Sequence, residues 1–306
     1  MIEPLAKSLH WLKSKRRWAQ FSMRGISAIV TVACTVLALW IVPAERQRRA
    51  VAAFRMVDGR IYYANHYHAE PKAFSRTLLR RWLPRDYVDE VHEVQFLWVR
   101  DLTDEGLIHL QGLTGLRRLN LSNKQVTDAG LAHLQSLTAL KELDLFDTWI
   151  TDAGLVHLSR LTRLQHLSLH NTRVTGAGLA HLRGLTDLRE LYLGDSDVSD
   201  AGMANLSALT HVQKLYLFHT QVTDAGLAYL QGLTELEQLN LDHTQITDAG
   251  LVHLQKLVRL ESLDVRDTHV THAGAVQLQQ ALPNCTIYAP SGVIGPMPAK
   301  LGRGVF

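Results

Sequence analysis

The stretch LRRLNLSNKQVTDAGLAHLQSLTA, residues 116–139, contains two hydrophobic periods in succession. Leu119 and Leu121 flank one polar residue, as alternating positions of a strand do. Leu131 and Leu134 then follow at helical spacing. The stretch therefore predicts a strand followed by a helical segment, with the leucines of both pointing into one apolar interior.

The same pattern recurs every 24 residues without insertion. Such in-register copies indicate a solenoid, because no single unit of this size can bury its apolar side alone. Neighbouring strands stack ~4.8 Å apart and neighbouring helices about 8–10 Å apart, so the array is expected to curve, with a parallel sheet inside and helices outside. The eight copies are marked by a hydroxyl residue at Thr103, Thr127, Thr151, Thr175, Ser199, Thr223, Thr247 and Thr271.

The pattern resembles the leucine-rich repeats, and the phrase Thr-Asp-Ala-Gly-Leu at 127–131 is similar to the 24-residue subtype of membrane-anchored bacterial repeat proteins. The resemblance covers about residues 91–288 and implies an α/β leucine-rich-repeat solenoid. A first strand is predicted near Val91 and a ninth near Ile287, which gives nine parallel strands. The resemblance says little about function, because one fold carries many functions.

Polar positions that recur in every copy are expected to serve the architecture. Thr127 and Asp128 are both suited to cap a helix N-terminus, and Gly130 is expected to allow a close approach or to relieve the turn. Gly176 replaces the aspartate in one copy. A row of hydroxyls after the strands is expected to satisfy the loop backbone, at Thr148, Thr172, Ser196, Thr220, Thr244 and Thr268.

The segments outside the repeats differ in composition. Residues 1–25 are basic, and residues 26–42 contain no charge over 17 positions, which predicts a transmembrane helix preceded by a cytoplasmic segment. A signal peptide cleaved after Ala44 is the alternative. Residues 43–90 are predicted to be a connector and N-terminal cap, with a helix from Glu45 and a strand at 60–63. Residues 289–306 are predicted to be a flexible tail.

Charge and motifs exclude several classes of function. Residues 103–282 carry 13 Lys and Arg against 20 Asp and Glu, so nucleic-acid binding is disfavoured. Two cysteines are too few for a disulfide framework. The sequence contains no catalytic or cofactor-binding motif, and we therefore predict neither an enzyme nor a cofactor. Five histidines share one helix position and are interpreted as a consensus of the convex face: His109, His133, His157, His181 and His253.

A second group of histidines lies in the loops after the strands. His219 and His243 occupy equivalent positions in adjacent copies and are expected about one strand spacing apart, ~5 Å. Asp195 and Asp267 flank them, and Asp242 is a further potential ligand of a divalent metal. Coincidence in a His-rich chain is the preferred interpretation, so no metal is assigned.

Outward positions of the strands vary from copy to copy and include large rings. We therefore predict a partner-binding patch on the concave face. The alternative is that the rings only pack on one another across strands. The candidate residues are Phe146, Trp149, His170, Tyr192, Tyr216 and Phe218.

The function predicted from these features is a membrane-anchored module that binds a protein partner through its concave face, with the repeats on the non-cytoplasmic side. The alternatives are a structural envelope protein without a dedicated ligand, and a carbohydrate-binding module in which aromatic rings lie beside Asp144, Glu190 or Asp242.

Overall fold

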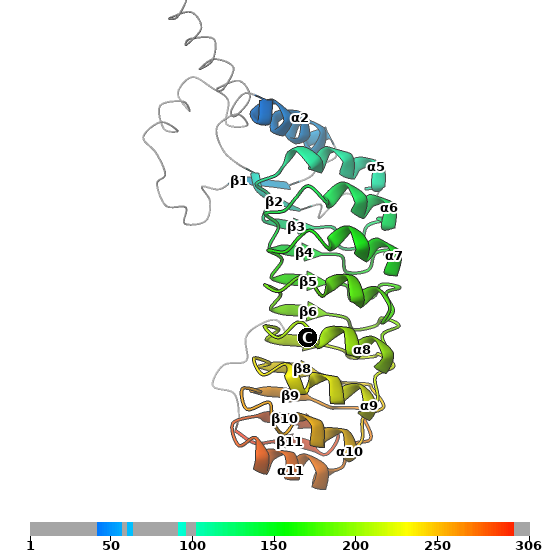
Figure 1. Cartoon of the computed structure of the whole chain (residues 1–306), viewed down its shortest axis with the longest axis vertical. Helices are drawn as coiled ribbons and strands as arrows, with labels where there is room; N and C mark the ends of the chain where they lie inside the picture. Colours follow the sequence, from blue (N-terminus) through cyan, green and yellow to red (C-terminus); the bar gives the residue numbers. More distant parts are fainter. Residues whose placement is uncertain (1–41, 57–59, 64–90, 96–101, 297–306) are drawn as a thin grey trace, which may run out of the picture. The chain divides into compact units, whose positions relative to one another are not determined.

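The computed structural model describes residues 42–56, 60–63, 91–95 and 102–296 (Figure 1). The predicted basic segment, all of the predicted membrane helix except Val42, and most of the connector lie outside these residues. Within the described residues, no helix combines the length and the apolar character needed to cross a membrane. The chain divides into two units, and all repeats belong to the unit formed by 50–72 and 89–306.

The described strands form one sheet in which spatial order follows sequence order. Strands β2 to β10 are parallel, so the nine predicted parallel strands are confirmed, and β1 and β11 add antiparallel edges. The strands are β1 Arg60–Tyr63, β2 Val91–Gln95, β3 Arg118–Asn120, β4 Glu142–Asp144, β5 His166–Ser168, β6 Glu190–Tyr192, β7 Lys214–Tyr216, β8 Gln238–Asn240, β9 Ser262–Asp264, β10 Thr286–Ala289 and β11 Gly292–Ile294.

The constant repeat length places equivalent residues directly opposite each other. Leu119 pairs with Leu143, and Leu143 pairs with Leu167. These leucines are at most 1% exposed, as are Leu131 and Leu134 of the helical layer. The apolar interior between the two layers, predicted from the leucine spacing, is therefore confirmed.

The helical layer lies on the other side of the core from the sheet (Figure 1). Most copies form one α-turn followed by a 3₁₀ segment rather than a full helix, because leucines three residues apart match the 3.0-residue turn of a 3₁₀ helix. The segments are α5 Asp104–Leu107, η3 Ile108–Gly112, α6 Asp128–Leu131, η4 Ala132–Leu134, α7 Asp152–Leu155, η5 Val156–Leu158, η6 Gly178–Leu182, α8 Asp200–Leu206, α9 Asp224–Leu227, η7 Ala228–Gly232, α10 Asp248–Leu251, η8 Val252–Leu254 and α11 His272–Ala281.

The repeated aspartate has a different role from the one predicted. Thr127 caps α6 as expected, since its side chain accepts a hydrogen bond from the Ala129 N–H. The Asp128 carboxylate instead accepts from the backbone N–H (2.8 Å) and the hydroxyl (2.6 Å) of Thr151 in the next copy. The prediction that the aspartate caps its own helix was wrong, because the stacked neighbour offers two donors at once. We call this contact the aspartate clamp; it joins Asp104–Thr127, Asp128–Thr151, Asp152–Thr175, Asp200–Thr223, Asp224–Thr247 and Asp248–Thr271.

The glycine of the repeat makes room for the aspartate clamp. A Cβ at Gly130 would overlap the carboxylate of Asp104, so the close approach expected there is confirmed. The copy that carries Gly176 in place of aspartate is joined differently. Gly176 and Gly202 meet backbone to backbone, and the Asn205 side chain donates to the Gly176 carbonyl at 2.8 Å.

Each loop that follows one of the strands β3 to β9 contains a residue in the left-handed conformation. The φ values run from +48° to +58° at Asn123, Asp147, Asn171, Asp195, His219, His243 and Asp267. Except in the first of these loops, where Lys124 follows, the next residue carries the predicted hydroxyl. The Thr148 hydroxyl donates to the Leu145 carbonyl at 2.6 Å. The same bond in the later copies confirms that these hydroxyls satisfy the loop backbone.

Both ends of the array carry additional structure. The helix predicted from Glu45 is α2, Val42–Met56, whose Ala50 and Val51 are buried with the repeat core. At the other end, β11 pairs with β10, which corrects the prediction of a flexible tail for residues 289–296. Gly292, with φ +117°, permits the reversal that brings β11 back onto the edge strand. Residues 297–306 lie outside the described residues.

Candidate binding site on the sheet face

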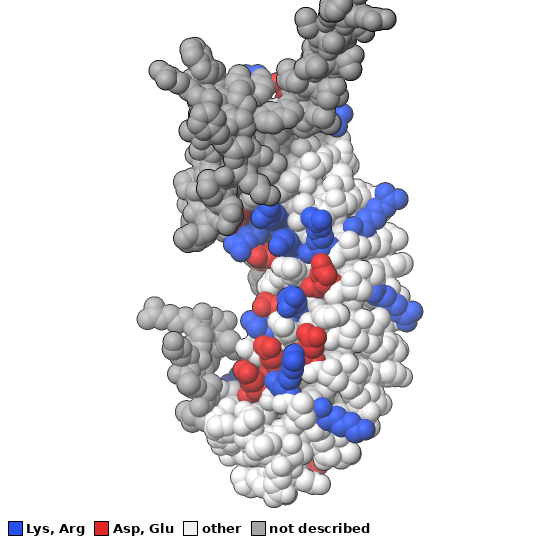
Figure 2. Space-filling view, turned by 60° about the vertical axis from the view of Figure 1, so that its left-hand side comes forward, with Lys and Arg blue, Asp and Glu red and all other residues white. Residues whose placement is uncertain are grey.

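Each strand directs alternate side chains into solvent on one side of the sheet, here called the sheet face. In the β5 copy these are His166, Ser168 and His170, because Leu167 and Leu169 between them are buried. Equivalent positions of adjacent copies are one strand spacing apart, so outward side chains form rows along the array. Figure 2 shows acidic and basic side chains intermingled on this face.

A row of rings crosses four copies near the strand ends. The Phe146 and His170 rings stack with centroids 4.9 Å apart, and the Phe218 ring lies 4.8 Å from His170 on a tilted plane. Phe218 reaches His170 across the copy that carries Gly194, where an added Cβ would overlap the Phe218 ring. Gly194 is thus the residue that makes this row continuous.

A second row of rings lies on the strands themselves. Tyr192 and Tyr216 stack almost in parallel, with centroids 4.5 Å apart and an interplanar angle of 7°. His166 leans on Tyr192 at 4.9 Å and 43°. The Tyr216 hydroxyl donates to the Gln238 side chain at 2.9 Å. Burial raises the pKa of both tyrosines, so the phenols stay neutral.

Glu190 ties the second row to the sheet. Its carboxylate contacts His166 Nδ1 and Lys214 Nζ, each at 2.9 Å, and accepts from the Tyr192 hydroxyl at 3.1 Å. The hydrogen bond from His166 is the largest cause that lowers the Glu190 pKa to about 2, with Lys214 and Tyr192 adding to it against the effect of burial. Glu190 is therefore a fixed negative charge that holds three neighbours in place.

A cavity of about 360 Å³ opens between the two rows. Ser168 is 8% exposed and is the smallest of the lining residues. Asp144 lies at one side, where its carboxylate accepts from the Asn120 amide at 2.9 Å and from the Phe146 N–H at 3.0 Å. Both donors are neutral, and Asp144 has no ion pair among the described residues. The lining residues are Asp144, Phe146, His166, Ser168, His170, Tyr192 and Phe218.

The structure brings most of the predicted site residues together. Phe146, His170, Tyr192 and Phe218 line the cavity, and Tyr216 stacks behind Tyr192. These rings do pack on one another, as the alternative interpretation expected, and they also surround a cavity.

Trp149 is the exception among the predicted residues. It is 58% exposed, lies in the turn that pairs with Thr127, and does not line the cavity. His166 was not predicted as a site residue; it lies two residues before Ser168, which shares its row with the predicted Tyr192 and Tyr216. The row of His166 continues with Glu190 and Lys214 in the next two copies. Ionisable residues of opposite charge at equivalent positions of adjacent copies could have indicated that these side chains contact one another.

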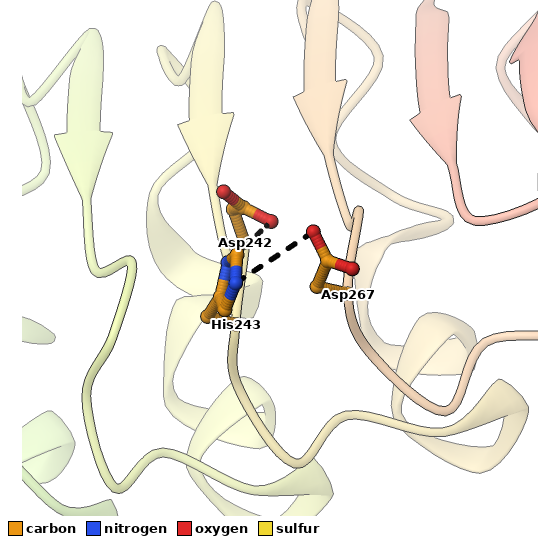
Figure 3. Close-up of side chains that lie close together, drawn as sticks. All are labelled: Asp242, His243 and Asp267. Atoms are coloured by element: carbon orange, nitrogen blue, oxygen red, sulfur yellow. Dashed lines mark ion pairs between the residues drawn. The ribbon is translucent and has the colours of Figure 1, made fainter.

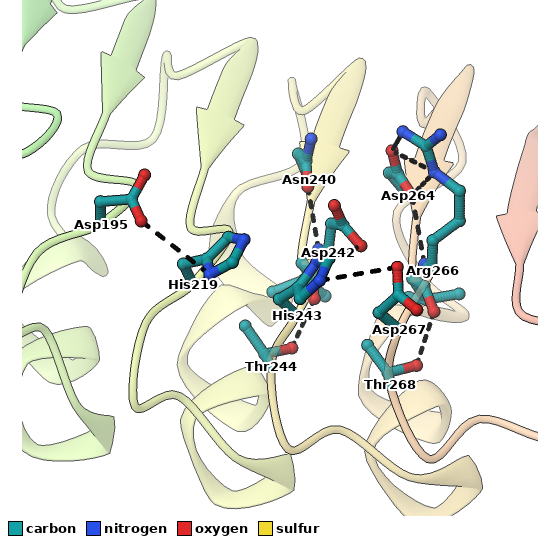
Figure 4. A network of polar contacts seen from close by, with 12 residues as sticks. Asp195, His219, Asn240, Asp242, His243, Thr244, Asp264, Arg266, Asp267 and Thr268 are labelled. Carbon is teal, nitrogen blue, oxygen red and sulfur yellow. Dashed lines mark hydrogen bonds and ion pairs between the residues drawn. The ribbon is translucent and has the colours of Figure 1, made fainter.

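The histidine pair of the loops lies close together, as expected. The His219 and His243 rings stack with centroids 4.1 Å apart. His219 Nδ1 is 3.9 Å from Asp195 Oδ1 (Figure 4). All four residues of the predicted row adopt the left-handed conformation, which asparagine, aspartate and histidine tolerate better than most residues do. Backbone geometry therefore accounts for the residue types of the row.

The same loops contain one group that has the composition of a metal site. Among the described residues, Asp242, His243 and Asp267 are the only three potential ligands whose atoms lie within 4.8 Å of one another. The carboxylates approach different nitrogens of the ring: Asp242 Oδ1 lies 3.1 Å from Nδ1 and Asp267 Oδ2 lies 3.7 Å from Nε2 (Figure 3). Because one ion takes one ring nitrogen, this geometry fits an imidazole between two carboxylates better than a metal centre.

Comparison with known proteins shows what the repeats are similar to. Residues 136–159, 208–230 and 233–254 match the model of a family described as Leucine Rich repeat. The internalin C2 structure from Listeria monocytogenes superposes with a TM-score of 0.54 at 25% identity, over 65% of this chain and 80% of that one. An internalin (InlF) structure from the same organism gives 0.42 at 23% identity, over 59% and 62%. No curated protein matches the sequence. Three segments of the repeat array are therefore similar to the leucine-rich repeat.

Proposed function

We propose that this chain is a leucine-rich-repeat module that binds a protein partner through the sheet face, the face expected to be concave. The observation that supports this most strongly is the continuous pair of aromatic rows around the cavity. Aromatic side chains that are rigid and partly buried supply much of the energy at protein interfaces. The likeness to an internalin supports a scaffold of this kind and does not identify the partner.

The stacking pattern favours a protein partner over a carbohydrate. Sugars bind by lying on free ring faces, whereas the Tyr192 ring has Tyr216 on one side and His166 on the other. The His170 ring is similarly flanked by Phe146 and Phe218. The rings form a stiff wall with a defined hollow, which suits the insertion of a partner's side chain.

Site-specific photo-crosslinking in native membranes tests this function. A photoreactive phenylalanine analogue at Phe218 should yield a discrete adduct with one protein. The same analogue at Tyr229, which is 43% exposed in η7 on the helix side, is the matched control and should not. The proposal is overturned if position 218 gives no adduct or if both positions give the same one.

We further propose that residues 26–42 anchor the chain in a membrane, with the repeats outside the cytoplasm. The support is the uncharged run itself and the basic residues before it. A reporter enzyme active only outside the cytoplasm, fused after Phe306, should be active, and carbonate washing should leave the chain in the membrane. An inactive reporter would reverse the orientation, and release of a shortened chain would indicate cleavage.

A further inference from the structure

Two rings that line the cavity, one from each row, have both of their faces covered. The His170 ring lies between two rings of its own row, whose centroids are 4.9 Å and 4.8 Å away. The Tyr192 ring lies between Tyr216 at 4.5 Å and His166 at 4.9 Å. Because their faces are occupied, His170 and Tyr192 present their edges to the cavity.

The edge of an aromatic ring attracts different groups from its face. A ring carries negative charge on its face and positive charge at its edge, so edges attract the face of another ring. A cation, by contrast, binds over a free face, and the faces of His170 and Tyr192 are occupied. The ring edges therefore favour an aromatic guest, whose face can meet them, over a cationic or a saturated one.

The size of the cavity agrees with an aromatic guest. Its volume is about 360 Å³, whereas a cavity of about 150 Å³ already holds a benzene molecule. Ser168 lines this space, and the equivalent position in the next two strands is tyrosine. The small side chain at this one copy leaves room for a ring between the two rows.

An ionised acceptor at the side of the cavity distinguishes among aromatic guests. The Asp144 carboxylate accepts from the Asn120 amide and the Phe146 N–H and has no ion pair among the described residues. Its two oxygens can accept further hydrogen bonds. The indole of tryptophan has one N–H at the rim of a flat ring, and this group only donates. Tryptophan can therefore meet the ring edges with its face and Asp144 with its donor.

From this arrangement we infer that the cavity beside Ser168 is a subsite for a tryptophan side chain of the protein partner, held by the edges of His170 and Tyr192 and by Asp144. The inference rests on the proposed function and names the residue that enters the cavity. It also gives the stacking within the rows a role, because stacked rings are fixed with their edges around one space.

Disulfide tethering tests the subsite without the partner. Ser168→Cys places a thiol at the cavity, and the full-length chain is equilibrated with pairs of small thiols at equal concentration. Mass spectrometry then measures which mixed disulfide forms. The thiol 2-(indol-3-yl)ethanethiol carries the proposed guest, and 2-cyclohexylethanethiol carries a saturated ring. We expect the indole to be preferred about fivefold, as for an edge-to-face contact together with one hydrogen bond to a carboxylate.

A second cysteine variant corrects for the intrinsic reactivity of the thiols. Ser262 is partly exposed in β9 and does not line the cavity, so Ser262→Cys is the matched control. The fivefold preference is the ratio between the two variants. The wild-type chain, with its native Cys34 and Cys285, gives the background.

A change at Asp144 separates the hydrogen bond from the ring contact. Asp144→Asn, added to Ser168→Cys, should lower the preference for indole over the phenyl ring of 2-phenylethanethiol about threefold, because the acceptor loses its charge. The preference for phenyl over cyclohexyl should stay the same. Glu142→Gln removes a charge from the same strand outside the cavity and should leave both preferences unchanged.

The outcomes separate this inference from the proposed function. Equal preferences in Ser168→Cys and Ser262→Cys would overturn the tryptophan subsite. Stronger capture of 2-aminoethanethiol than of the indole would also overturn it, since the cavity would then take a cation. If crosslinking from position 218 persists in either case, the sheet face still binds a protein and only the chemistry of the cavity is wrong. If crosslinking fails while the indole is preferred, the proposed function fails and the subsite stands as a local property.

Discussion

On the helix side of the repeats, Asp128 and its equivalents make the same contact at six joints, whereas on the sheet face every complete copy presents a different set of outward side chains. The helix side also repeats a bond from a glutamine to a histidine of the next copy, as between Gln111 and His133 at 2.9 Å. Contacts that recur at each joint hold the stack together. Side chains that change from copy to copy are free to form one local site, and here they form the aromatic rows around Ser168.

The joint between Gly176 and Gly202 is the exception on the helix side and gives the largest predicted effect. An added Cβ at Gly202 would overlap the backbone of Gly176, which cannot move aside as a flexible side chain does. We expect Gly202→Ala to lower the free energy of unfolding by about 3 kcal/mol. Urea denaturation measures the loss. Gly232→Ala is the control, since nothing lies within 4 Å of its added Cβ, and it should have little effect.

Removing one aspartate clamp should have a smaller effect. Asp128→Ala leaves the N–H and hydroxyl of Thr151 without their acceptor, so we expect a loss of about 2 kcal/mol in the same experiment. Asp187 is an exposed aspartate outside the clamps. If Asp187→Ala destabilises the chain as much as Asp128→Ala does, the clamp is not what joins the copies.

The sequence was sufficient for the fold because the leucine spacing determines both layers and the constant length fixes the register. It did not reveal the clamp, because Asp128 next to Thr127 looks locally like a second cap. Its partner lies 23 residues away and becomes adjacent only when the copies stack. The site was predicted in part for a similar reason. The outward positions of the rings follow from the strand pattern of each copy. The contact of Phe218 with His170 could not be predicted in this way, because it depends on the absence of a side chain at Gly194 in the copy between them.

The charge held by Glu190 should make the sheet face sensitive to acid. The folded pKa of about 2 lies below the ordinary value of 4.5, so Glu190 stabilises the fold fully above pH 4.5 and loses this contribution as the pH falls toward 2. The carboxylate is partly exposed, and solvent screening limits the effect to about 1 kcal/mol. The stability difference between wild type and Glu190→Gln should therefore shrink over this interval. Glu261→Gln, an exposed charge removed elsewhere, controls for net charge, and a parallel pH dependence in all three proteins would contradict the assignment.

Trp149 gives the smallest predicted effect and the sharpest test of where the binding surface ends. It is as large as any ring of the two rows, yet it is 58% exposed and no described ring stacks on it. Trp149→Ala should change stability by less than about 0.5 kcal/mol and should leave crosslinking from position 218 intact. Tyr216→Ala is the matched change inside the rows. It removes the stack on Tyr192 and the bond to Gln238, and it should cost about 1 kcal/mol and reduce the adduct. If Trp149→Ala reduces the adduct as much as Tyr216→Ala does, partner binding does not depend on the stacked rows alone, and the binding surface extends into the turns.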